Sequence, residues 1–170
     1  MAKKETPVDK NSREFAVIQR DSSRLMILIT IIFTLLNMVL LLCGAERFFL
    51  FAATLPYYIT WFGMLFDGGG VGSTTVAALV LAVIFLTVFV MGWIFSKKSR
   101  GWVKAMLVAY IVDTVALLAI FFAFRMAVGS ILDIAIHFAL VWEMVNLQRH
   151  DVKLRAMDIR LQAETQEGKK

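Results

Sequence analysis

Cysteine, proline and histidine are all scarce in this chain of 170 residues. It contains one cysteine, two prolines and two histidines. The single cysteine, Cys43, excludes an intramolecular disulfide and any zinc or iron–sulfur site built on several thiolates. Two prolines and the lack of a repeat period argue against a linker-rich chain or a solenoid. Charge is scarce too, since charged residues make up 18% of the chain, whereas about a quarter is usual in soluble domains.

Apolar sequence is what the chain has in abundance, at 59% of its residues. A water-soluble core cannot use that much apolar surface, whereas a lipid bilayer can. The net charge of +5 would suggest nucleic acid as the partner of a soluble protein. In a membrane protein the same excess is explained by basic segments on the cytoplasmic side. We therefore expect an integral membrane protein with no nucleic-acid partner and no cofactor.

Four apolar stretches approach the roughly 20 residues that an α-helix needs to cross a bilayer. They predict an all-α, four-helix membrane bundle with spans at about 25–43, 76–95, 102–124 and 127–147. Residues 1–24 form a polar segment, in which Asp21, Ser22 and Ser23 are the candidate N-caps of the first span. Residues 148–170 mix charged and apolar side chains, and we expect them to continue the fourth helix beyond the membrane.

A fifth apolar stretch, 48–66, contains Pro56 and a cluster of aromatic side chains. Whether this stretch crosses the membrane can be decided from the positive-inside rule, because a basic turn precedes the third span. With four spans this turn, the basic N-terminal segment and the basic tail all lie in the cytoplasm; a fifth span would place one of them outside. We therefore predict a membrane protein with both termini cytoplasmic and 48–66 as a re-entrant or interfacial segment outside. The basic turn carries Lys97, Lys98, Arg100 and Lys104.

The glycine-rich stretch from Asp67 to Ser73 follows this segment. A phosphate-binding loop would need a preceding strand and a final Gly-Lys-Ser or Gly-Lys-Thr, and neither is present. We interpret the stretch as a mobile linker whose following residues, Thr74 and Thr75, cap the second span.

Three ionisable residues, Asp113, Asp133 and His137, fall inside the last two spans. Each costs about 2.5–3.5 kcal/mol to insert at bilayer depth, so such groups usually face the bundle interior and have partners. The two spans form a hairpin, and mirroring depth across its turn near Met126 brings Asp113 almost level with His137. We expect these two side chains within hydrogen-bond or one-water reach. Asp133 lies four residues before His137 and shares its helix face.

Further polar residues extend this predicted centre onto every span. On the third and fourth spans the same faces carry Tyr110, Thr114 and Ser130, with Glu143 level with Tyr110. The first span has a stripe of polar residues at spacings of four and three, and the second has one polar residue near its middle. These residues are Thr30, Thr34, Asn37 and Thr87.

Three interpretations of the centre are open. It can hold the bundle together, as polar pairs between membrane helices do, in a non-enzymatic accessory or structural subunit. It can carry protons or cations in a coupled transporter built on Asp113, Asp133 and His137. It can support acid–base catalysis or metal-dependent catalysis, since Asp133-x-x-x-His137 can chelate and Asp113 would be a third ligand. No sequence motif names a reaction.

Some short stretches are similar to those of a known group of proteins. Phe48-Phe49-Leu50-Phe51, running into Leu55-Pro56-Tyr57-Tyr58, resembles a segment of uncharacterised small four-span membrane proteins of Gram-positive bacteria, as do Asp113-Thr114 and Asp133-x-x-x-His137. The resemblance implies a bacterial plasma membrane and the four-span layout, and it implies no activity. The expected partners are the bilayer and either another protein or further copies of this chain.

Overall fold

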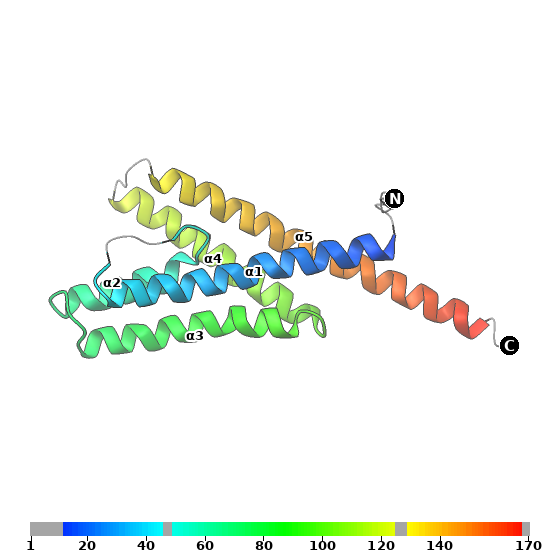
Figure 1. Cartoon of the computed structure of the whole chain (residues 1–170), viewed down its shortest axis with the longest axis horizontal. Helices are drawn as coiled ribbons and strands as arrows, with labels where there is room; N and C mark the ends of the chain where they lie inside the picture. The colour runs from blue at the N-terminus through cyan, green and yellow to red at the C-terminus, as the bar shows by residue number, and fades with distance from the viewer. Residues whose placement is uncertain (1–11, 46–48, 125–128, 168–170) are drawn as a thin grey trace, which may run out of the picture.

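The computed structural model describes residues 12–45, 49–124 and 129–167, and these residues fold into five helices (Figure 1). Four of the helices are long and apolar enough to cross a membrane, and the exception is α2. The predicted all-α, four-helix membrane architecture is therefore confirmed. The helices are α1 (Arg13–Leu42), α2 (Thr54–Phe66), α3 (Ser73–Phe95), α4 (Arg100–Phe124) and α5 (Gly129–Glu167).

The four long helices alternate in direction around a closed ring, in which α1 packs on α5, α5 on α4, α4 on α3 and α3 on α1. The short helix α2 packs against α1, α3 and α4. Figure 1 places the N-terminal end of α1 and the C-terminal end of α5 at the same end of the bundle. The turn between α3 and α4 lies at this end as well, whereas α1 ends and α3 begins at the opposite end.

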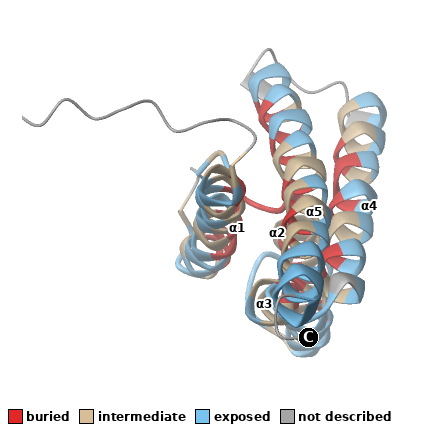
Figure 2. Ribbon diagram, turned by 90° about the vertical axis from the view of Figure 1, so that its right-hand side faces the viewer, coloured by how far each residue is buried: buried red, intermediate tan, exposed pale blue. Residues whose placement is uncertain are grey.

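Buried and exposed residues divide each helix lengthwise, with the buried side facing the neighbouring helices (Figure 2). The core includes Ile27, Phe89, Met106 and Met144. Large apolar side chains also cover the outside: Phe122, for example, is 74% exposed. An apolar outer surface over four long helices suits contact with lipid and would be a liability in water.

The N-terminal boundary of α1 differs from the prediction. The helix begins at Arg13, where the Ser12 hydroxyl caps it by accepting a hydrogen bond from the amide of Phe15 at 3.1 Å. The expected caps Asp21, Ser22 and Ser23 lie well inside the helix, so that prediction is wrong. Residues 13–24 remain helical because one side of them packs against α5 and buries Ala16 and Ser23.

Together, residues 13–24 of α1 and 148–167 of α5 form a two-helix stalk that continues the bundle at its terminal end. The helix α5 runs without a break from the apolar region to Glu167. Arg13 Nε lies 2.7 Å from Asp158 Oδ1 across the stalk, and Leu154 is buried between the helices. The α3–α4 turn rests on the stalk's base, where Lys97 Nζ is 3.6 Å from Asp21 Oδ1.

The turn between α2 and α3 is held by Asp67 and is not a bare linker. One carboxylate oxygen accepts the backbone amide and the hydroxyl of Thr75, both at 2.6 Å, and the amide of Gly72 at 3.0 Å. A β-carbon on Gly72 would lie 2.6 Å from Asp67 Cγ, so only glycine leaves room for this carboxylate. Gly72 is the N-cap of α3, and Asp67 supplies the acceptor that Thr74 and Thr75 were expected to provide.

Candidate functional site

The polar centre of the bundle forms where α2 begins. The Thr54 amide, at the start of α2, is bonded to Asp113, which lies midway along α4. The non-helical residues 49–53 therefore reach the middle of the bundle, and α2 runs from there back to the end at which α1 stops (Figure 1). Pro56 falls in the first turn of α2, where its missing N–H is not needed, so it starts this helix and does not break it.

Asp113 caps α2 from another helix. Its Oδ1 accepts the Leu55 amide at 2.6 Å, and its Oδ2 accepts the Thr54 amide at 2.9 Å. The N-cap residue of α2, Ala53, has no side chain able to do this. The carboxylate is fully buried, and the positive end of the helix dipole stabilises its charge.

Polar side chains of α1 form hydrogen bonds with the backbone of the non-helical segment before α2. The Asn37 amide group donates to the Phe49 carbonyl at 2.8 Å and accepts the Phe49 amide at 2.5 Å. The Thr34 hydroxyl accepts the Ala53 amide at 2.8 Å. Irregular backbone at membrane depth persists only where protein groups satisfy it, and Asn37 and Thr34 provide those groups. Phe51 adopts a left-handed conformation with φ of 67°, a strain that the surrounding bonds hold in place.

His137 joins α5 to this arrangement. Its Nε2 lies 3.1 Å from Asp113 Oδ2 and 2.9 Å from the Thr54 hydroxyl. Its Nδ1 lies 2.9 Å from the Asp133 carbonyl and 3.4 Å from an Asp133 carboxylate oxygen. The predicted proximity of Asp113 and His137 is therefore confirmed. The Tyr110 ring stacks on the imidazole, with centroids 5.4 Å apart.

These contacts determine where protons must lie. The Asp133 carbonyl can only accept a hydrogen bond, so Nδ1 of His137 carries a hydrogen. Asp113 Oδ2 already accepts the Thr54 amide, and its contact with His137 Nε2 is attractive only if a proton lies between them. The pair therefore holds one titratable proton, either on the imidazole or on the carboxyl group.

The remaining predicted residues lie apart from this contact. Thr114 is buried and bonds to the Tyr110 carbonyl of its own helix at 2.8 Å, and Glu143 accepts a hydrogen bond from Ser23 at 3.0 Å. Thr87 was expected to complete the centre from α3, and that prediction is wrong: Thr87 is exposed and bonds to its own helix. The side chain of Ser130 lies outside the described residues.

A small cavity adjoins the centre at Asp133. Its volume is about 10 Å³, which holds one water molecule and no larger solute. Among the residues that the structure describes, no group of three His, Cys, Asp or Glu side chains could hold a metal ion. Asp113 points both oxygens at α2 amides, which leaves it unsuited to be the third ligand of the metal hypothesis. The cavity is lined by Asn37, Phe49, Ala52, Ala53, Thr54, Tyr57, Tyr58 and Asp133.

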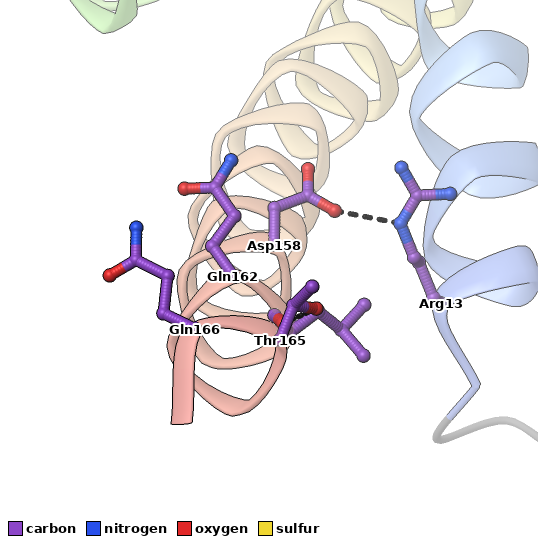
Figure 3. A pocket seen from close by; sticks show the side chains of 6 residues that line it. Arg13, Asp158, Gln162, Thr165 and Gln166 are labelled. Carbon is purple, nitrogen blue, oxygen red and sulfur yellow. Dashed lines mark hydrogen bonds and ion pairs between the residues drawn. The ribbon is translucent and has the colours of Figure 1, made fainter. Parts of the chain in front are cut away.

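A larger hollow lies on the stalk, far from the polar centre along α5. This groove of about 620 Å³ runs beside the Arg13–Asp158 ion pair, and the residues that line it are polar except for Leu161 (Figure 3). The sequence does not predict this groove, because its walls come from within residues 1–24 and 148–170, two segments far apart in the chain. The side chains lining it are Arg13, Asp158, Leu161, Gln162, Thr165 and Gln166.

Sequence reasoning also missed Thr54, whose amide and hydroxyl bind Asp113 and His137 respectively. Pro56 is the signal that could have found it, because proline favours the first turn of a helix and places the helix start just before it. The resulting arrangement can fix a helix end inside the bundle and can exchange one proton. Compared with known proteins, the chain matches no protein-family model, no curated protein and no solved structure.

Proposed function

We propose that this chain is a non-enzymatic accessory or structural subunit of a bacterial plasma membrane. In this proposal both termini are cytoplasmic, and α2 is a re-entrant helix that enters from the outer face. The bundle anchors the stalk, and the stalk presents a docking surface to a protein partner or to another copy of the chain.

The charge distribution supports this orientation. The stalk end carries Lys97, Lys98 and Lys104 together with the charged helices of the stalk. In the part of the opposite end that the structure describes, Asp67 is the one charged side chain. Basic residues gather on the cytoplasmic side of membrane proteins, so the stalk belongs in the cytoplasm.

The observation that supports the structural role is that hydrogen bonds within the protein already use both carboxylate oxygens of Asp113. Both of its oxygens accept backbone amides of α2, and one of them also contacts His137. A carboxylate used in this way fixes a helix, and the adjoining cavity of about 10 Å³ is too small for a transported solute. The polar centre therefore has a structural role, which is to hold the start of α2 inside the bundle.

This structural role can be tested by measuring the thermal stability of the purified protein from pH 5 to 9. We expect Asp113→Asn and His137→Gln to be much less stable than the wild type and to share the loss of its pH dependence. Thr87→Val is the matched control, because Thr87 is exposed and bonds only to its own helix. Variants of Asp113 and His137 that remain as stable as the wild type would contradict the structural role.

The accessory role has its own test in the stalk. A partner that co-purifies with the full chain should be lost when residues 148–170 are removed, while the bundle keeps its thermal transition. Asp158→Ala is a milder variant that breaks only the ion pair to Arg13 and alters one wall of the groove. Full retention of the partner by the truncated chain would place docking elsewhere.

A proton- or cation-coupled transporter is the second candidate, favoured by the chain of groups Asp133, His137 and Asp113. One proton lies between Asp113 and Nε2 of His137. On the other side of the ring, Nδ1 lies 3.4 Å from the carboxylate of Asp133, which borders the small cavity. Proton flux into liposomes that contain the purified protein would support this candidate if Asp113→Asn abolished the flux and left the fold intact. Equal background flux with and without the wild-type protein would exclude it for protons.

A further inference from the structure

We propose that the surface of the α4–α5 pair at the stalk end binds the headgroup of an anionic phospholipid through Lys104 and Arg149. The inference uses the placement of the bundle in a membrane and does not depend on the accessory role. Its basis is that Lys104 and Arg149 lie at nearly the same depth, are exposed beside lipid-facing apolar side chains and have no acidic partner among the described residues.

The register of α4 and α5 places the two cations at one level. The contact of Asp113 with His137 fixes the antiparallel helices against each other. Lys104 precedes Asp113 by nine residues and Arg149 follows His137 by twelve. At 1.5 Å per residue, both lie about 14–18 Å from this contact toward the stalk end, within one helical turn of each other.

In the described part of the chain, these two cations have no acidic partner, unlike several others at the stalk end. Arg13, Lys97 and Arg155 each lie within 4.0 Å of an aspartate carboxylate. Lys104 and Arg149 are exposed, and neither forms an ion pair with any residue in the described part of the chain. Their charges are therefore available to an external anion.

The neighbourhood of the two cations is that of a membrane interface. The Arg149 guanidinium carbon lies 5.6 Å from the Trp142 ring centroid, and Trp142 is 59% exposed. Val108, one turn from Lys104 toward the membrane centre, is also 59% exposed. Val108 and Trp142 each lie five residues, about 7.5 Å, from the Asp113–His137 contact, so these exposed apolar side chains suit the acyl chains below the two cations.

The second arginine–tryptophan pair shows why Arg149 is the better candidate. Arg24 lies 5.4 Å from the Trp93 ring centroid, but its guanidinium also donates to the Ser96 hydroxyl. Arg24 is therefore committed to the protein, whereas Arg149 keeps its donors for a ligand. A lipid phosphate would take hydrogen bonds from Arg149 and Lys104 while its acyl chains cover Val108 and Trp142.

The test compares lipids that differ in headgroup charge. Purified protein in detergent is titrated with phosphatidylglycerol or with phosphatidylcholine of the same acyl chains, and its thermal transition is followed. We expect phosphatidylglycerol to raise the transition by several degrees, and the variant Lys104→Gln/Arg149→Gln to need at least fivefold more of it for the same shift. Equal shifts from the two lipids in the wild type would overturn the proposal.

Two controls separate the site from general attraction between charges. Arg13→Gln/Lys97→Gln removes the same charge from the stalk end and should respond to phosphatidylglycerol as the wild type does. If this variant loses the shift to the same extent, binding is unspecific and the site is refuted. Soluble glycerol phosphate should give no shift, and a full shift from it would mean that the ligand is a free phosphate and not a lipid.

Discussion

The Oδ1 atom of Asp113 on α4 lies 2.6 Å from the amide nitrogen of Leu55, in the first turn of α2. The carboxylate thus caps a helix to which it does not belong, and that helix starts in the middle of the bundle. Burying this helix end without a partner would leave amides unsatisfied where no water can reach them. The pairing of Asp113 with α2 is what allows a short helix to end inside an apolar bundle.

Replacing Asp113 by Asn should therefore cost more than removing any single hydroxyl group in the centre. The Asn side chain has one oxygen for the two backbone amides of α2. Its NH₂ group would face the second amide, so that two hydrogen-bond donors would face each other. We expect a loss of about 1.5–3 kcal/mol, the range for hydrogen bonds to a charged group. Thr54→Val removes only the hydroxyl contact with His137 and should cost about 0.6–2 kcal/mol. Unfolding in mixed detergent micelles measures both, and the reverse order would refute the capping role.

The non-helical segment before α2 should depend on Asn37. In Asn37→Asp the group that donates to the Phe49 carbonyl becomes an acceptor, so two oxygens face each other. We expect faster hydrogen exchange of the amides in residues 49–55, while the amides of α3 stay protected. Thr30→Val, on the same helix, is the control because its hydroxyl bonds only to Met26 of α1. Unchanged exchange in the Asn37 variant would mean that other contacts hold the segment.

Two buried glycines offer a matched test of packing. A β-carbon on Gly63 would lie 2.6 Å from Ala78 Cβ and 2.9 Å from Thr75 Cα, neither of which can move without shifting α3. A β-carbon on Gly92 would lie 2.9 Å from Met106 Cβ, which is a longer approach than at Gly63, and its contacts at 3.0 and 3.2 Å are with the movable Sδ and Cγ atoms of Met106. Gly63→Ala should therefore destabilise the fold by about 1–3 kcal/mol and Gly92→Ala by less. Thermal unfolding of the two variants checks this, and equal losses would contradict it.

Local features of the sequence predicted much of this arrangement. The spans followed from the lengths of their apolar runs, which the bilayer thickness constrains. The contact of Asp113 with His137 followed from the hairpin, because a short turn between adjacent helices fixes their register. Both arguments relate residues that lie in one helix or in two consecutive helices.

Contacts between distant segments were not predictable in this way. Helical spacing cannot say which face of α3 meets the core, since nearly all of its residues are apolar, and Thr87 proved to face outward. Asp113 was assigned a histidine partner, yet its amide partners on α2 come from a segment 58 residues away. The stalk pair of Arg13 and Asp158 joins positions 145 residues apart. Packing of the whole chain decides such contacts, and spacing within one helix carries no information on them.

The turn at Asp67 should remain intact in acid. The hydroxyl and the backbone amide of Thr75 lower the pKa of the Asp67 carboxyl from its ordinary 3.8 to about 2. A pKa that is lower in the folded state means that the carboxylate stabilises the fold fully above about pH 4 and loses this effect as the pH falls through 2. Carbon NMR of the labelled carboxyl group should therefore give a midpoint near 2, and a midpoint at 3.8 would show that the turn is not formed.

The contribution of the Thr75 hydroxyl can be separated from that of the amide. Thr75→Val removes the hydroxyl bond to Asp67 and leaves the bond from the backbone amide in place. We therefore expect the pKa of Asp67 to rise part of the way toward its ordinary value, which moves the loss of stability to higher pH. Thr74→Val is the comparison variant: it should raise the pKa of Asp67 less, because the Thr74 side chain lowers that pKa less than the Thr75 hydroxyl does and the bond from the Thr74 amide, at 3.3 Å, survives. An equal rise in both variants would mean that bulk at the start of α3, and not the hydroxyl of Thr75, sets the pKa of Asp67.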